Sequence, residues 1–210
     1  MKNTRTVLAC ATALVAMAVA THARAGTLAV TVVDSGGHPV RDAVVVAELP
    51  GKHAPVVQHS YTMLQKDIAF HPFVLVVPVG ATVSFPNADN TRHQVYSFSA
   101  PRPFELKLFA RDETRSVRFD RPGVVALGCN IHDAMSAFVF VADNAWTART
   151  DDAGVAMLPD LPNVAGHITV WHPYQRSPDN RVDIAIAAGA RTATTTLHLR
   201  MPPMHTMGGY

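Results

Sequence analysis

Cysteine is scarce in this sequence, which has two cysteines, Cys10 and Cys129, among 210 residues. Cys10 falls in an apolar run near the N-terminus, so the remainder of the chain has a single cysteine and cannot form an internal disulfide. Aromatic residues (7%) and charged residues (16%) are few. Helical periodicity is nearly absent, and no later apolar run approaches the length of a membrane-spanning helix. These absences argue against a disulfide-rich domain, a helical bundle and a membrane span.

Residues 1–25 have the three parts of a secretory signal peptide. Lys2 and Arg5 precede an apolar run at 7–20, and an Ala-x-Ala cleavage site comes before Gly26. We therefore expect a periplasmic or secreted protein from which this signal peptide is cleaved. Lipid attachment is the less favoured alternative, because the apolar stretch before the N-terminal cysteine is too short.

The charge of the chain changes when the signal peptide is removed. Cleavage takes away three basic residues and no acidic ones, which leaves 15 basic and 16 acidic side chains and a formal charge near −1. Neither nucleic acid nor an anionic membrane is indicated as a partner. The lone remaining cysteine would be open to oxidation in an oxidising compartment unless it is buried or bound to a metal.

Short apolar runs with β-branched residues alternate with clusters of Gly, Pro, Asn and Asp along the chain, which is the pattern of a β-sandwich. We expect a strand at 27–33, a turn at 34–37 and a partner strand at 39–49. A longer strand is expected at 75–85. The sequence thus predicts an all-β fold, and its length after cleavage suits two small β-domains.

Three side chains that bind metals fall within seven residues, at Cys129, His132 and Met135. This segment follows an apolar run at 124–127, so we expect a ligand loop between two strands. His93 lies 36 residues before Cys129, after a turn-rich segment that can bring it beside the loop. Two histidines and one cysteine in a plane, with a distant axial methionine, form the ligand set of a blue-copper site.

Zinc binding and a purely structural role are the alternatives for these residues. Zinc also accepts cysteine and histidine, although structural zinc sites rarely use a thioether. A lone cysteine at the end of a strand is often only a small buried side chain. If Met135 does not bind, the site would keep an open position. The combination of all four residues favours copper.

The segment 57–143 resembles a cupredoxin. The resemblance includes the strand at 75–85, the turn at Asn87, the sequence His93-Gln94-Val95, and Pro122-Gly123-Val124 before the cysteine. The Cys-x2-His-x2-Met spacing is similar to the short loop of amicyanin rather than to that of plastocyanin. The resemblance implies a Greek-key β-sandwich with one type 1 copper bound by His93, Cys129, His132 and Met135. It departs from the family where Ile131 and Asp133, rather than prolines, flank the histidine.

The flanking segments resemble a second sandwich, of the carboxypeptidase-regulatory-like or transthyretin-like type. Its first half matches at Asp34, Gly37, Pro39, Val40, Ala43 and Val45, and its second half matches at 147–154, 158–162 and 167–173. We expect 26–55 and 144–200 to fold together, with the cupredoxin inserted between them. The alternative is a tandem arrangement in which the first hairpin flanks the cupredoxin. Proteins with both modules resemble those called methylamine-utilisation proteins, a label that does not establish methylamine as the electron source.

These resemblances imply a one-electron carrier that meets redox partner proteins. An enzyme is not expected, because multicopper enzymes need His-x-His pairs and none of the eleven histidines is spaced that way. His132 would be the exposed ligand, and Ile131, Ala134 and Phe98 would surround it with an apolar docking patch. Copper delivery or storage is the alternative function, since the same soft ligands hold cuprous copper.

The last ten residues, 201–210, contain a second set of soft ligands. Prolines and glycines predict a disordered tail, in which Met201, Met204, His205 and Met207 are spaced for a weak cuprous site. The alternative is an unconstrained tail whose methionines have no function.

Overall fold

The computed structural model describes residues 26–51 and 60–200. The predicted signal peptide at 1–25 and the predicted tail site at Met201, Met204, His205 and Met207 lie outside the described residues. Within the described ranges, the structure has no helix that is both long and apolar enough to cross a membrane.

The described residues form strands almost throughout, with one 3-10 helix and no α-helix. The prediction of an all-β fold is confirmed. The elements are β1 (Gly26–Asp34), β2 (Val44–Glu48), β3 (Tyr61–Thr62), β4 (Leu64–Lys66), β5 (Ala69–His71), β6 (Val74–Pro78), β7 (Ala81–Pro86), β8 (His93–Ser97), β9 (Phe104–Phe109), β10 (Thr114–Phe119), β11 (Gly123–Gly128), β12 (Ser136–Ala142), β13 (Thr147–Arg149), β14 (Val155–Leu161), β15 (Gly166–Trp171), η1 (Pro178–Asn180), β16 (Arg181–Ile186) and β17 (Thr192–Leu197).

Strands from the two ends of the chain build one pair of sheets, which we call the terminal unit. Its sheets have the orders β14-β1-β17 and β13-β2-β15-β16. The alternating burial of β1 points Leu28, Val30 and Val32 inward, where they meet Val45 of β2 and Ile168 of β15 in one core. Burial of this apolar surface stabilises the pairing of β1 with β17, which is parallel and joins residues far apart in sequence.

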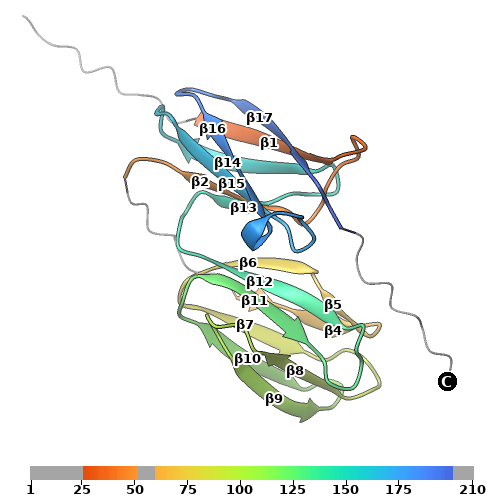
Figure 1. Ribbon diagram of the computed structural model, residues 1–210. Coiled ribbons are helices and arrows are strands. Elements are labelled where there is room, and N and C mark those ends of the chain that lie inside the picture. Colours follow the sequence, from red (N-terminus) through yellow and green to blue (C-terminus); the bar gives the residue numbers. More distant parts are fainter. Residues whose placement is uncertain (1–25, 52–59, 201–210) are drawn as a thin grey trace, which may run out of the picture.

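The middle of the chain, β3 to β12, builds the second pair of sheets, which we call the central unit. Its sheets have the orders β10-β7-β3 and β6-β12-β11-β8-β9, and the hairpin β4-β5 lies beside them. Phe85, Phe109 and Phe119 are almost fully buried in its core, together with Val95 and Val139. Figure 1 shows the terminal unit and the central unit as two separate halves of the molecule.

The structure differs from the expected strands in two places. The predicted strand at 75–85 is two strands, β6 and β7, because the turn at Val79 and Gly80 carries the chain from one sheet to the other. Gly80 has a φ of 88°, which favours glycine. The strands β1 and β2 also do not pair as a hairpin: they lie in different sheets of the terminal unit, and the isolated bridge from Val33 of β1 goes to Pro39, which precedes β2.

An apolar layer joins the two units. Trp171 at the end of β15 packs with Val44 of β2 against Val74, Phe138 and Phe140 on the outer face of the five-stranded sheet. The ring of Trp171 lies 5.7 Å from the rings of both Phe138 and Phe140. The terminal unit therefore covers one face of the central unit.

Candidate metal centre

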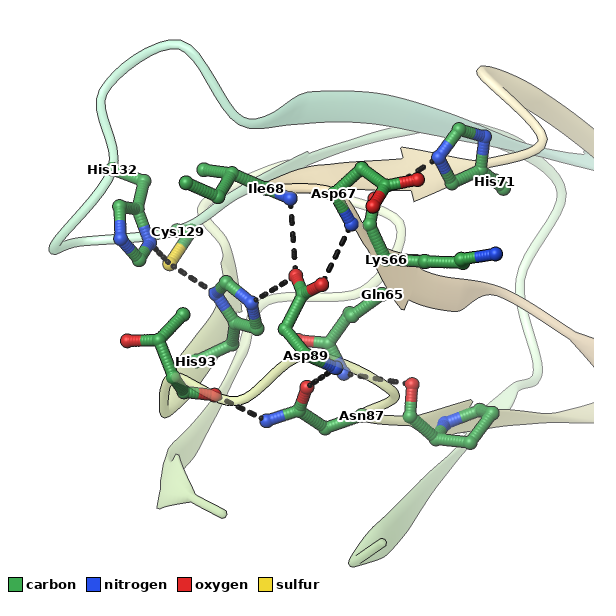
Figure 2. Close-up of polar contacts among 12 residues, drawn as sticks. Gln65, Lys66, Asp67, Ile68, His71, Asn87, Asp89, His93, Cys129 and His132 are labelled. Atoms are coloured by element: carbon green, nitrogen blue, oxygen red, sulfur yellow. Dashed lines mark hydrogen bonds and ion pairs between the residues drawn. The ribbon is translucent and has the colours of Figure 1, made fainter. Parts of the chain in front are cut away.

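Loops gather at one end of the central unit and are tied together by hydrogen bonds. The Asn87 amide donates to the Glu113 carbonyl at 3.0 Å, and the Asp112 amide donates to the Asn87 carbonyl at 2.8 Å. These bonds connect the β7–β8 loop to the β9–β10 turn. The turn of the β4–β5 hairpin is tied to the β7–β8 loop by Asp89 (Figure 2).

The ligand loop predicted from the sequence closes the β11–β12 hairpin at this end. The Cys129 amide donates to the Met135 carbonyl at 3.2 Å, and the Met135 amide donates to the His132 carbonyl at 2.9 Å. The preceding residue, Gly128, has no room for a side chain, because a Cβ there would lie 2.7 Å from the ring of Tyr96. This close packing fixes the strand end from which the Cys129 side chain projects.

The structure brings His93, Cys129 and His132 together. The Cys129 Sγ lies 3.9 Å from Nδ1 of His93 and 3.7 Å from Nδ1 of His132. One ligand atom from each of the three residues fits within 4.8 Å of the others, so this group could hold a metal ion. His93 is fully buried and Cys129 is 3% exposed, whereas His132 is only partly buried.

The distances match those of a metal bound between the three side chains. Bond lengths of about 2.3 Å to sulfur and about 2.0 Å to nitrogen, at an angle of about 120°, separate sulfur from nitrogen by about 3.7 Å. Both measured distances between Cys129 Sγ and the imidazole nitrogens are close to this value. Met135, the predicted axial ligand, is 1% exposed and packs in the same core cluster as Cys129.

Asp89 is a residue of the site that the sequence did not reveal. Its Oδ2 accepts a hydrogen bond from Nε2 of His93 at 2.8 Å, which leaves Nδ1 of that ring facing the cysteine. A carboxylate behind a histidine orients the ring, fixes its tautomer and makes it a stronger ligand. The only sequence signal was an acidic residue in the turn four positions before His93.

Two groups at the site have shifted pKa values. Partial burial and the neighbouring His93 ring lower the pKa of His132, and Asp89 opposes this effect. Burial tends to raise the pKa of Asp89, but hydrogen bonds from the Ile68 amide, the His93 ring and the Asp67 amide hold it below its usual value. A neutral His132 beside an ionised Asp89 suits metal binding, because an imidazole must be unprotonated to bind a metal.

Apolar side chains in the ligand loop and beside the strand end that precedes it are exposed. Ile131 is 47% exposed, next to His132 in the loop, and Ala134 is also exposed. Phe98, which is 88% exposed, packs on the ring of Tyr96 and lines a shallow groove with Ala126 and Gly128.

Among the described residues, His71, His167 and His172 lie outside the cluster of His93, Cys129 and His132. Nε2 of His71 contacts the Lys66 carbonyl at 3.1 Å on the exposed β4–β5 hairpin. His167 is exposed, and His172 is 6% exposed in the terminal unit.

Comparisons with known proteins return structural neighbours only. No protein-family model matches the sequence, and no curated protein matches it. A variant of amicyanin in its reduced Cu(I) form at pH 4 is 18% identical over 47% of this chain and 98% of that chain, with a TM-score of 0.38. A purple cupredoxin from Nitrosopumilus maritimus is 21% identical over 40% of this chain and 100% of that chain, with a TM-score of 0.36. These neighbours thus cover about half of the chain or less.

Proposed function

We propose that this protein is a one-electron carrier with a type 1 copper held by His93, Cys129 and His132, and with Met135 as the weak axial ligand. The observation that carries this proposal is the convergence of two imidazole Nδ1 atoms on the Cys129 Sγ, at 3.9 and 3.7 Å. Copper bound to two nitrogens, one sulfur and a distant thioether gains or loses an electron with little change in ligand geometry.

The fold holds three of the four proposed ligands rigidly. His93 begins β8 and Cys129 follows β11, so the two strands fix these residues, and Asp89 fixes the His93 ring from behind. Met135 is buried, and its backbone is tied to the loop at both its amide and its carbonyl. Ligands held in this way limit the rearrangement between oxidation states, which favours fast electron transfer.

His132 is the ligand nearest to solvent and therefore the point at which a redox partner exchanges an electron. The exposed Ile131 and Ala134 beside it supply apolar contact for a small, short-lived encounter. Neither side chain carries a charge that would have to be desolvated when the partner docks. We propose that the partner is another redox protein.

A reversible redox titration tests this function. The protein is loaded with one equivalent of copper, reduced and reoxidised without oxygen, and assayed for bound metal at each stage. The carrier account predicts one electron per copper, with copper retained through repeated cycles. A metal analysis that finds zinc instead of copper in protein purified from its native source would contradict it.

Copper delivery or storage is the second candidate, and the tail residues Met201, Met204, His205 and Met207 favour it as soft ligands for cuprous copper. In that case copper would leave the protein for a chelator when its oxidation state changes. Deleting residues 201–210 and titrating cuprous ion against a competing chelator identifies a weaker second class of site, if one is there. A single class of site in both proteins would show that the tail residues do not bind cuprous copper.

We also propose that the cupredoxin unit at 57–143 is inserted into a second sandwich formed by 26–55 and 144–200, and that 1–25 is a cleaved signal peptide. The sheet orders support the insertion, because strands on both sides of the central unit pair with each other. Cleavage after residue 25 would make Gly26 the first residue of the exported protein. Mass spectrometry of the exported protein tests the cleavage: a first residue other than Gly26 would contradict it.

A further inference from the structure

The two-residue turn of the β4–β5 hairpin has a backbone conformation that its side chains disfavour. Asp67 and Ile68 have φ values of 56° and 55°, and Lys66 pairs with Ala69 across the turn. Such turns usually contain glycine or asparagine, which tolerate a positive φ. A β-branched residue is an outlier there, so the conformation of Ile68 is strained and other contacts must hold it.

One carboxylate supplies these contacts. Oδ1 of Asp89 accepts the Asp67 amide at 2.7 Å, and Oδ2 accepts the Ile68 amide at 3.0 Å. The same Oδ2 accepts Nε2 of His93 at 2.8 Å, as Figure 2 shows. Asp89 thus connects a strained surface turn to a ligand of the proposed metal centre through a single charged group.

The backbone of Asp89 is held on its other side by Asn87. The Asp89 amide donates to Oδ1 of Asn87 at 2.9 Å. Nδ2 of Asn87 in turn donates to the carbonyls of Thr91 and Phe109 at 2.9 and 3.2 Å. Because these bonds fix the backbone of Asp89, its carboxylate is held in place. The two turn amides and the His93 ring therefore compete for the negative charge of one carboxylate.

We propose that Asp89 is a positioning residue which couples the conformation of the Asp67–Ile68 turn to the reduction potential of the metal centre. This inference rests on the proposed function. The two amides withdraw negative charge from the carboxylate, and the charge that remains faces Nε2 of His93. A movement of the turn therefore changes how strongly the His93 ring donates to copper, without a change in any ligand.

The coupling predicts opposite shifts for two variants. Asp89→Asn removes the negative charge behind His93, which favours the cuprous state and raises the potential. Ile68→Pro removes the amide donor to Oδ2 and cannot keep the positive φ of the turn, but it leaves the carboxylate, so more charge faces His93 and the potential falls. A role in ligand rigidity alone would move both potentials in one direction.

Asp34 in the terminal unit offers a matched control. Its Oδ1 accepts the amides of Gly36 and His38 at 2.8 and 2.9 Å, and its carboxylate contacts the His38 ring at 3.2 Å. This set of contacts parallels that of Asp89 but includes no proposed metal ligand. Asp34→Asn should leave the potential at the wild-type value.

Hydrogen exchange of the unaltered protein provides a second test that needs no variant. Coupling is reciprocal, so copper binding should slow exchange of the Asp67 and Ile68 amides by about 5-fold or more, while the Gly36 and His38 amides do not change. Equal exchange with and without copper, or variant potentials that shift together, would overturn the inference. A copper adduct without the visible absorption of a blue site would overturn the proposed function instead, so the two failures are distinguishable.

Discussion

Met135 enters the core with its side chain, while its amide and carbonyl close the ligand loop. Because the axial ligand tunes the potential of a blue-copper site, we predict that Met135→Gln retains copper and lowers its reduction potential. Protein-film voltammetry measures this directly. Met63→Gln is not a useful comparison, since it also buries an amide in the core; Met157→Gln, at a methionine that is 53% exposed, is the suitable control. A potential in Met135→Gln equal to that of the control would show that the thioether is not a ligand.

The buried side chain of His172 should make the free energy of unfolding depend on pH. Burial lowers its pKa from 6.5 to about 4, and the nearby Asp42 opposes this shift. Its Nδ1 accepts the Tyr174 amide at 3.2 Å, which requires the neutral ring. The unfolded chain binds a proton in this range more readily than the folded chain, so the free energy of unfolding decreases as the pH falls from 6.5 to about 4.

The size of this effect is about 1.4 kcal/mol per pH unit, or about 3 kcal/mol over the whole interval. Urea unfolding of the apoprotein at several pH values measures it. His172→Gln should flatten the slope, whereas His167→Gln, at the exposed histidine of the neighbouring strand β15, should keep it. A wild-type slope in His172→Gln would assign the effect to another group.

The residues of the proposed metal centre divide into those that the sequence predicts and those that it does not. His93, Cys129 and His132 were predicted from chemistry and spacing, because few other roles need these side chains together. Asp89 was not, since a carboxylate in a turn is common and its contacts come from a hairpin more than 20 residues away in sequence. The direction of its side chain depends on tertiary packing.

At the scale of strands and sheets, the contact between β15 and β12 joins the two units through Trp171. This residue is 5% exposed, and its ring touches Phe138 and Phe140. We predict that Trp171→Ala lowers the free energy of unfolding by about 3–5 kcal/mol and separates one thermal transition into two. Calorimetry follows both changes.

Trp146→Ala is the matched control for this experiment. Trp146 is 7% exposed and packs in the core of the terminal unit, rather than between the units. Its loss should destabilise the protein without separating the transitions. Two transitions in the Trp146 variant and one in the Trp171 variant would show that Trp171 is not the residue that makes the two units unfold together.

The strands themselves were predictable in type but not in pairing. Alternating apolar residues identify a strand whatever its neighbour, so β1, β2 and the segment of β6 and β7 were expected. Their sheets were not, because a turn such as Val79–Gly80 has the same sequence features whether the chain returns in one sheet or crosses to the other. The parallel pairing of β1 with β17 depends on residues at opposite ends of the described chain.

For the whole molecule, metal binding to the folded chain should add stability. At a free copper concentration about 100 times the Kd, binding stabilises the folded state by about 2.7 kcal/mol. For a chain of this length, that raises the Tm by about 5–10 °C. Differential scanning calorimetry of apoprotein and loaded protein measures the shift, which Cys129→Ser should reduce. An equal Tm with and without copper would mean that the metal binds outside the folded site.

The proposed function depends on binding of copper by the Cys129 thiolate together with His93 and His132. Its most direct test is the visible absorption spectrum of protein loaded with one equivalent of cupric ion. A thiolate bound to cupric copper in a trigonal site gives an intense visible band, so the account predicts strongly coloured protein that loses its colour in Cys129→Ser and on reduction. A colourless cupric adduct, or a colour that survives Cys129→Ser, would contradict it.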